Sequence, residues 1–283
     1  MHLALVAVQL MFASLAIAAK IALREIPPFG LIAFRAPAAA LILIAARLFV
    51  RPWERLAARD LPVVALHALL GIVANQLLFI AGLSRSTATN AVVIGATIPV
   101  FTVGVAVVLK REAATPAKIL GLAVAFLGAL TIVGGGFQAG GRVLVGNLLI
   151  VCNSLSFSIY LVISRPMLAR YKTITVITWT MVFGALGVLP FGVRDLTTHA
   201  PMLSVSAWLA MAYIALFPTV GTYFLNGYAL RRAPSSLVAI YVYVQPVIGA
   251  LLAATFLGER PTVFVGAGGA LIALGIFLVN RSR

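Results

Sequence analysis

The stretch LPVVALHALLGIVANQLLFIAGL, residues 61–83, decides the fold class of this chain. It holds no Lys, Arg, Asp or Glu, and an α-helix needs about 20 consecutive, mostly apolar residues to cross a lipid bilayer. Two amides, Asn75 and Gln76, stand within it. The stretch therefore predicts a transmembrane helix that carries polar groups at depth.

The composition extends this prediction to the rest of the chain. Of the 283 residues, 63% are hydrophobic and 10% are charged, and the mean hydropathy is +1.12, whereas a soluble domain carries about 25% charged residues. No gap between the apolar runs is long enough for a soluble domain. We expect an all-α integral membrane protein with ten transmembrane helices, over residues 3–23, 29–49, 61–83, 87–109, 117–133, 143–163, 173–193, 206–228, 235–257 and 262–280.

The basic residues indicate how the chain is oriented. The net charge is +15, and the Lys and Arg side chains stand mainly in the short gaps between apolar runs, which is typical of topology signals and not of nucleic-acid binding. With ten crossings and the N-terminus inside, fourteen Lys and Arg fall on the inner side and six on the outer side. This excess predicts a multi-pass protein of a bacterial inner (plasma) membrane with both termini in the cytoplasm.

The chain also matches itself. Residues 61–133 align with 208–280 at an offset of 147 without a gap, and sixteen of the 73 positions are identical, among them Pro99 with Pro246 and Glu112 with Glu259. Two five-helix repeats follow, residues 1–136 and 137–283, within one membrane domain. An odd number of crossings makes the second repeat enter the membrane from the opposite side, which is the inverted arrangement of many secondary transporters.

These residues carry a family resemblance. Ile26-Pro-Pro-Phe29 followed by Phe34-Arg35, and Pro99 thirteen residues before Glu112, are similar to an EamA-type member of the drug/metabolite transporter superfamily. Pro246 and Gly258-Glu-Arg-Pro261 repeat the second pattern. The resemblance covers the whole chain, and it implies transport of small metabolites, often export of amino acids or related compounds.

Polar side chains within the spans are the candidates for substrate contact, because they are costly in lipid and tend to face a cavity or a neighbouring helix. Amides, hydroxyls and aromatic rings suit a zwitterionic or amphipathic small molecule, although ordinary interhelical hydrogen bonds explain them too. The predicted substrate-binding set is Asn75, Gln76, Phe79, Asn153, Tyr160, Thr219, Thr222, Tyr223, Asn226, Tyr241 and Gln245.

Three further residues in the spans have more than one interpretation. Pro99 and Pro246 each remove a backbone hydrogen bond, so they are hinge candidates or static kinks. Arg35 lies about 10 Å along its span. It can bind a carboxylate from a cavity, extend to the membrane surface or brace Glu25, and a structural role is the favoured interpretation.

The other function classes fit less well. No Walker A sequence, metal-ligand spacing or pair of acids within a span is present, so we expect no catalytic residues, metal, cofactor or ATPase subunit. A secondary transporter, exporting a small metabolite such as an amino acid by alternating access, is the favoured function. The alternatives are a channel or facilitative pore, and a membrane-embedded lipid-modifying enzyme.

Overall fold

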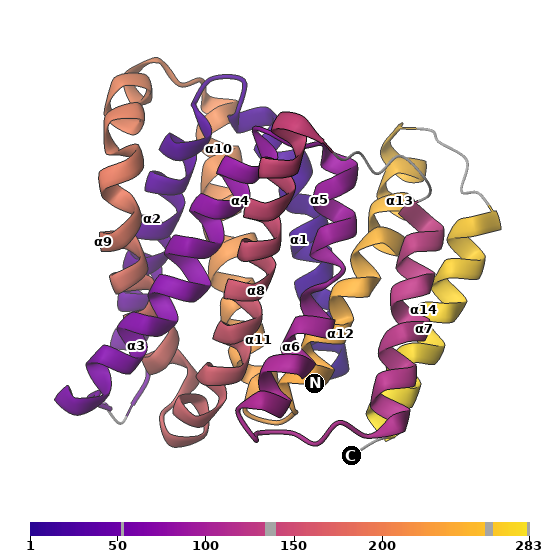
Figure 1. The fold of residues 1–283 in the computed structure, drawn as a ribbon. Helices are drawn as coiled ribbons and strands as arrows, with labels where there is room; N and C mark the ends of the chain where they lie inside the picture. Colours follow the sequence, from indigo (N-terminus) through magenta and orange to yellow (C-terminus); the bar gives the residue numbers. More distant parts are fainter. Residues whose placement is uncertain (52–53, 134–139, 258–262, 282–283) are drawn as a thin grey trace. The chain divides into compact units, whose positions relative to one another are not determined.

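The computed structural model describes residues 1–51, 54–133, 140–257 and 263–281, and in these ranges all regular structure is helical (Figure 1). The first half of the chain forms α1 (His2–Ala22), α2 (Pro28–Leu48), η1 (Ala58–Asp60), α3 (Leu61–Ala68), η2 (Leu69–Ala74), α4 (Asn75–Leu83), α5 (Ala88–Gly95), α6 (Ile98–Val108) and α7 (Pro116–Val133). The second half forms α8 (Gly141–Arg170), α9 (Thr173–His199), η3 (Ala200–Met202), α10 (Val205–Ile214), η4 (Ala215–Gly221), α11 (Thr222–Leu230), α12 (Ser235–Ile240), η5 (Tyr241–Tyr243), α13 (Val244–Leu257) and α14 (Val263–Arg281).

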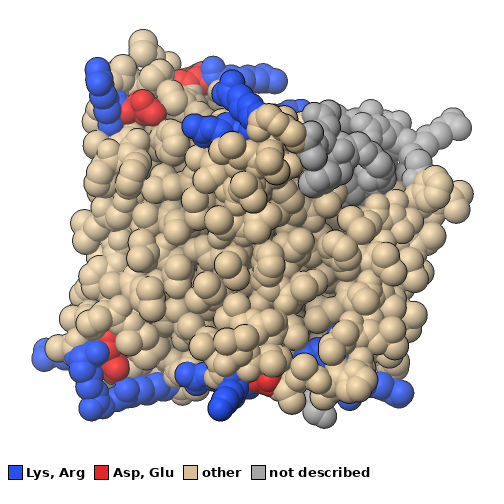
Figure 2. Space-filling model, viewed as in Figure 1, with Lys and Arg blue, Asp and Glu red and all other residues tan. Residues whose placement is uncertain are grey.

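The helices confirm an all-α membrane protein. Within the described residues, eight continuous helical stretches are long and apolar enough to cross a bilayer, and two shorter apolar helices, Pro116–Ile132 and Ser235–Gly249, coincide with the predicted fifth and ninth spans. On the visible face the charged side chains lie toward the helix ends, and the surface between them is uncharged (Figure 2). The number of ten crossings stays a prediction, and the boundary of the predicted repeats at residue 136 lies outside the described residues.

The chain folds into two compact units, each built from both halves of the sequence. Unit 1 comprises Met1–Ile80 and Ile163–Arg232, and unit 2 comprises Ala81–Val162 and Ala233–Arg283. The proposed repeats are defined by sequence similarity between the two halves of the chain. The units are defined by which residues pack together, so their boundaries differ from those of the repeats.

In unit 1 the long helices α2 and α9 pack against each other, and α1 packs against α10 and α11 (Figure 1). Ala18, Ala22 and Met211 belong to a buried cluster that joins α1 to α10. Ser204 begins α10 by accepting a hydrogen bond from the backbone N–H of Ala207. A serine at this position satisfies one of the free N–H groups at a helix start, so the local sequence sets where α10 begins.

In unit 2 the helices α7 and α14 pack against each other, and glycine makes the close approach possible. A Cβ atom on Gly128 would lie 2.7 Å from the carbonyl oxygen of Gly268, and one on Gly121 would lie 2.8 Å from that of Gly275. Small residues at such crossings let membrane helices gain van der Waals contact. Gly121 and Gly128, which align with Gly268 and Gly275 at the repeat offset of 147, therefore have a packing role.

The two repeat-related prolines stand where helices of unit 2 are interrupted. Pro99 is the second residue of α6, directly after the turn that separates α5 from α6. Pro246 is the third residue of α13, directly after the short 3₁₀ turn η5 that separates α12 from α13. Since the first turn of a helix has no use for the missing proline N–H, both residues fit these positions.

Candidate functional site

Two spans of unit 1 contain a π-helical turn at the same place in the sequence repeat. η2 covers Leu69–Ala74 and η4 covers Ala215–Gly221; moving the first range by 147 residues gives 216–221. A π-helical turn holds one extra residue, so its backbone groups leave the ordinary helical pattern, and such turns are frequent at functional sites. The turns lie directly before Asn75 and Thr222, which begin α4 and α11.

The local sequence explains the turn in η4. Pro218 has no N–H to donate to the carbonyl group of Ile214, four residues earlier. The hydroxyl of Thr219 donates to that carbonyl oxygen instead, at 2.8 Å. In η2, Gly71 stands at the position equivalent to Pro218, and its carbonyl oxygen accepts the hydroxyl of Tyr223 at 2.5 Å. A side-chain hydroxyl thus satisfies a backbone carbonyl in both turns.

Arg35 reaches from α2 to η4. Its Nε donates to Oγ1 of Thr219 at 3.1 Å, and this is compatible with the bond to Ile214, because a hydroxyl donates one hydrogen and still accepts. The interpretation that Arg35 braces Glu25 is wrong for this structure, since the Glu25 carboxylate accepts instead from the backbone N–H and the hydroxyl of Ser204, at 2.7 and 2.6 Å.

Tyr223 and Gln76 complete a polar cluster in unit 1, which we define as Arg35, Gln76, Thr219 and Tyr223. The hydroxyl of Tyr223 lies within interaction range of both the Arg35 guanidinium and the Gln76 amide. Gln76 is 7% exposed, and neither its Nε2 nor its Oε1 has a hydrogen-bond partner among the described residues. The Tyr223 hydroxyl lies near this amide, but no hydrogen bond of normal geometry within the described chain satisfies either amide atom, which is costly for a buried group.

The remaining predicted residues of unit 1 stand close to this cluster in sequence, but they differ in burial and in hydrogen bonding. Thr222 is fully buried, and its hydroxyl donates within its own helix, to the carbonyl groups of Pro218 at 2.7 Å and Thr219 at 3.2 Å. Asn226 is buried, whereas Asn75 is partly exposed and Phe79 is exposed. The Thr222 hydroxyl is thus used within its own helical stretch.

The other four predicted residues belong to unit 2. Asn153, Tyr160 and Tyr241 are buried and Gln245 is partly exposed, and all four take part in further interactions. The ring of Tyr160 packs at 5.8 Å from the ring of Phe157 on the same helix, α8. Their role in substrate contact stays a prediction.

The surroundings of Arg35 could not be read from the sequence. A charged side chain within a span was the available signal, but the sequence alone did not place Thr219 beside it. The π-helical turns were also unforeseen, although Pro218 at a position equivalent to Gly71 marked the place.

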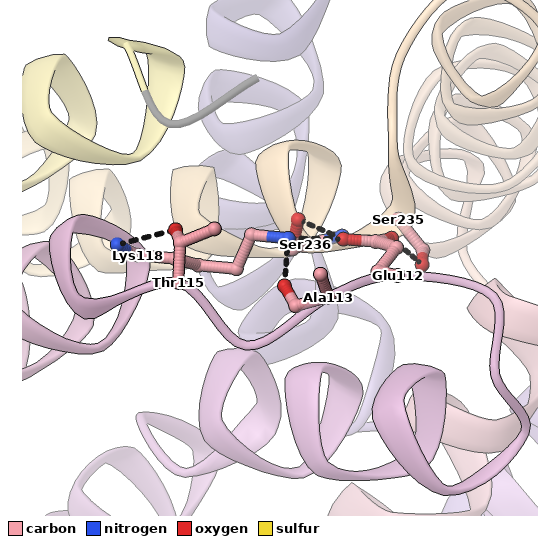
Figure 3. Close-up of polar contacts among 6 residues, drawn as sticks. All are labelled: Glu112, Ala113, Thr115, Lys118, Ser235 and Ser236. Carbon is pink, nitrogen blue, oxygen red and sulfur yellow. Dashed lines mark hydrogen bonds and ion pairs between the residues drawn. The ribbon is translucent and has the colours of Figure 1, made fainter.

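Glu112 shows what the acids at helix ends do (Figure 3). Its carboxylate accepts hydrogen bonds from the hydroxyls of Ser235 and Ser236 and from the Lys118 ammonium group, the last at 3.0 Å. Burial raises the pKa of Glu112, but the hydrogen bonds from Ser235, Ser236 and Lys118 outweigh burial and leave the pKa below its usual value of 4.5. The carboxylate joins the α6–α7 connection to the start of α12, as expected of a structural contact, while the equivalent Glu259 lies outside the described residues.

Comparison with known proteins places these features in a family. The sequence profile of the EamA-like transporter family matches residues 1–134 and again residues 144–281. An uncharacterized transporter of Archaeoglobus fulgidus is 28% identical over 100% of this chain and 98% of its own length. A probable terminal-alkyne amino-acid exporter of Streptantibioticus cattleyicolor is 33% identical over 79% of this chain and 74% of its own. A protein of known crystal structure, 22% identical, shares the fold with a TM-score of 0.80 over 99% of this chain and 96% of its own.

Proposed function

Since the chain belongs to the EamA-like transporter family, we propose that it is a secondary transporter that exports an amino acid or a closely related metabolite by alternating access. The observation that carries the proposal is the pair of π-helical turns, with the polar cluster attached to them inside apolar spans. The amide, hydroxyl and guanidinium groups of the polar cluster suit a small zwitterion. The name of the relative from Streptantibioticus cattleyicolor, a probable amino-acid exporter, supports the same substrate class.

Two inverted five-helix repeats with ten crossings would supply the alternating access. The irregular helix segments come in pairs at the repeat offset: η2 with η4 in unit 1, and the interruption before Pro99 with the one before Pro246 in unit 2. Two similar halves of opposite orientation can exchange conformations, which opens a central site first to one side and then to the other. In this proposal the two prolines are the hinges.

The proposed orientation has a direct test. Reporter fusions at Arg283 and in the Ala58–Leu61 connection should report the cytoplasm, and a fusion near Thr198 should report the outside of the bacterial plasma membrane. A cytoplasmic signal near Thr198 would contradict the inverted repeat and the alternating-access argument that depends on it.

Transport itself is tested with purified protein in proteoliposomes. Uptake of each of the common amino acids is measured with and without a pH gradient, and empty liposomes serve as the control. A carrier gives a rate that saturates with substrate, whereas single-channel currents would favour the alternative of a channel. Chemical change of the substrate or of the lipid would favour the third possibility, a lipid-modifying enzyme.

A further inference from the structure

Arg35 is a cation inside a membrane span, and no carboxylate of the described residues pairs with it. The acids in the described part of unit 1 are all within a few residues of helix ends: Glu25, Glu54, Asp60 and Asp195. The two ion pairs found in the described residues are Arg170 with Asp60 and Lys118 with Glu112. Charged side chains in a bilayer are costly, and they usually pair with another polar group or line a pathway for a substrate or ion. Since no described carboxylate pairs with Arg35, a ligand is a candidate for its counterion.

The hydrogen bond of Arg35 to Thr219 uses only one of its three guanidinium nitrogens. Thr219 takes the Nε hydrogen, which leaves the two Nη groups without a hydrogen-bond partner among the described residues. As a whole residue Arg35 is only partly buried. The two Nη groups form a planar fork that matches the two oxygens of a carboxylate.

Gln76 provides a second, independent sign of a ligand. Its side chain is more than nine-tenths buried. The Tyr223 hydroxyl lies near its amide, but neither amide atom makes a hydrogen bond of normal geometry in the described chain. An amide can donate to a carboxylate oxygen and accept from an ammonium group. An amino acid presents both groups on one carbon atom.

We propose that Arg35 binds the carboxylate of the transported molecule, with Gln76 beside it, so that the substrate itself is the missing counterion. The inference rests on the proposed transport function and narrows its substrate class to small molecules with a free carboxylate. Compounds in which a neutral carboxamide replaces the carboxylate are then poor substrates, because they leave the Arg35 charge unpaired in the membrane.

The test compares L-leucine with L-leucinamide, and propionate with propionamide, as matched probes. Affinity is read from ligand-induced thermal stabilisation of the detergent-purified protein, and transport from proteoliposomes. The variants are Arg35→Gln, which removes the charge, and Arg35→Lys, which keeps it. Lys20→Gln is the control, since it removes an exposed cation from the last turn of α1.

We expect the wild type and Lys20→Gln to prefer the free acid over its amide by tenfold or more, which corresponds to about 1.4 kcal/mol. Arg35→Gln should lose this preference while still binding the amide as the wild type does, and Arg35→Lys should recover part of it. A merely structural arginine would lower the melting temperature in Arg35→Gln and leave the preference intact, which would overturn the inference.

The result also separates this inference from the proposed function. If leucine and leucinamide are transported equally by the wild type and by Arg35→Gln, the inference is wrong and the transport function stands. If leucine is not transported but propionate stabilises the protein in an Arg35-dependent manner, the carboxylate site stands and the amino-acid substrate is wrong. If only phosphatidylglycerol vesicles stabilise the protein through Arg35, the residue binds a lipid phosphate and the inference fails.

Discussion

Replacing Gln76 by Leu is expected to stabilise the protein and to weaken substrate binding at the same time. The Gln76 amide is buried and has no hydrogen-bond partner in the described chain, and an unsatisfied buried polar group costs about 1–3 kcal/mol. Membrane proteins show smaller values, about 0.6 kcal/mol on average for an interhelical hydrogen bond, because the unfolded state in the membrane also finds partners. We therefore expect Gln76→Leu to gain about 0.5–1 kcal/mol.

The gain corresponds to a rise of about 1–3 °C in melting temperature, measured by tryptophan fluorescence of the protein in mixed detergent–lipid micelles. Loss of one neutral hydrogen bond to the substrate, about 0.5–1.5 kcal/mol, should raise the half-saturating concentration in proteoliposomes about two- to tenfold. Gln9→Leu is the matched control: Gln9 is 2% exposed in α1 of the same unit, but it does interact with the rest of the chain. Its removal should lower the melting temperature.

The reasoning would be refuted if Gln76→Leu lowered the melting temperature as much as Gln9→Leu and left the half-saturating concentration unchanged. Gln76 would then contribute to helix packing alone. A lower melting temperature for Gln9→Leu together with a higher one for Gln76→Leu is the expected contrast.

Three further experiments, each with its own substitutions, test the fold and the proposed hinges. Gly128→Leu should cost about 1–3 kcal/mol, since its Cβ would lie 2.7 Å from a backbone oxygen of α14, whereas Gly104→Leu, which meets open space, should unfold at the wild-type temperature. The hydrogen-bonded Glu112 carboxylate has a lowered pKa, so it stabilises the protein above about pH 4.5, and this contribution fades as the pH falls below that value. The variant Glu112→Gln should be less stable by about 1–3 kcal/mol at pH 7, and its melting temperature should lack this pH dependence. Pro99→Ala and Pro246→Ala should slow turnover in proteoliposomes with nearly unchanged substrate affinity. If both variants transport at the wild-type rate, the two prolines are not hinges and shape their helices only statically.

The amino-acid sequence is sufficient to predict that the chain lies in a membrane and in which order its apolar spans occur. Hydropathy is a sum over neighbouring residues, so a run such as residues 61–83 identifies a transmembrane helix without any knowledge of its neighbours. The repeat offset likewise needs only the chain, and it pointed to the paired positions Gly71 and Pro218. The family followed from short motifs whose order is visible in the sequence.

The tertiary structure alone decided which polar groups meet and which are satisfied. Thr219 and Thr222 look equivalent in sequence, yet one hydroxyl accepts from Arg35 and the other bonds only within its own helix. At the π-helical turns, the side-chain hydroxyls of Thr219 and Tyr223 donate to backbone carbonyl groups. Hydrogen bonding depends on distances between residues far apart in the chain, such as Arg35 and Thr219, 184 positions apart, and no local pattern in the chain records those distances.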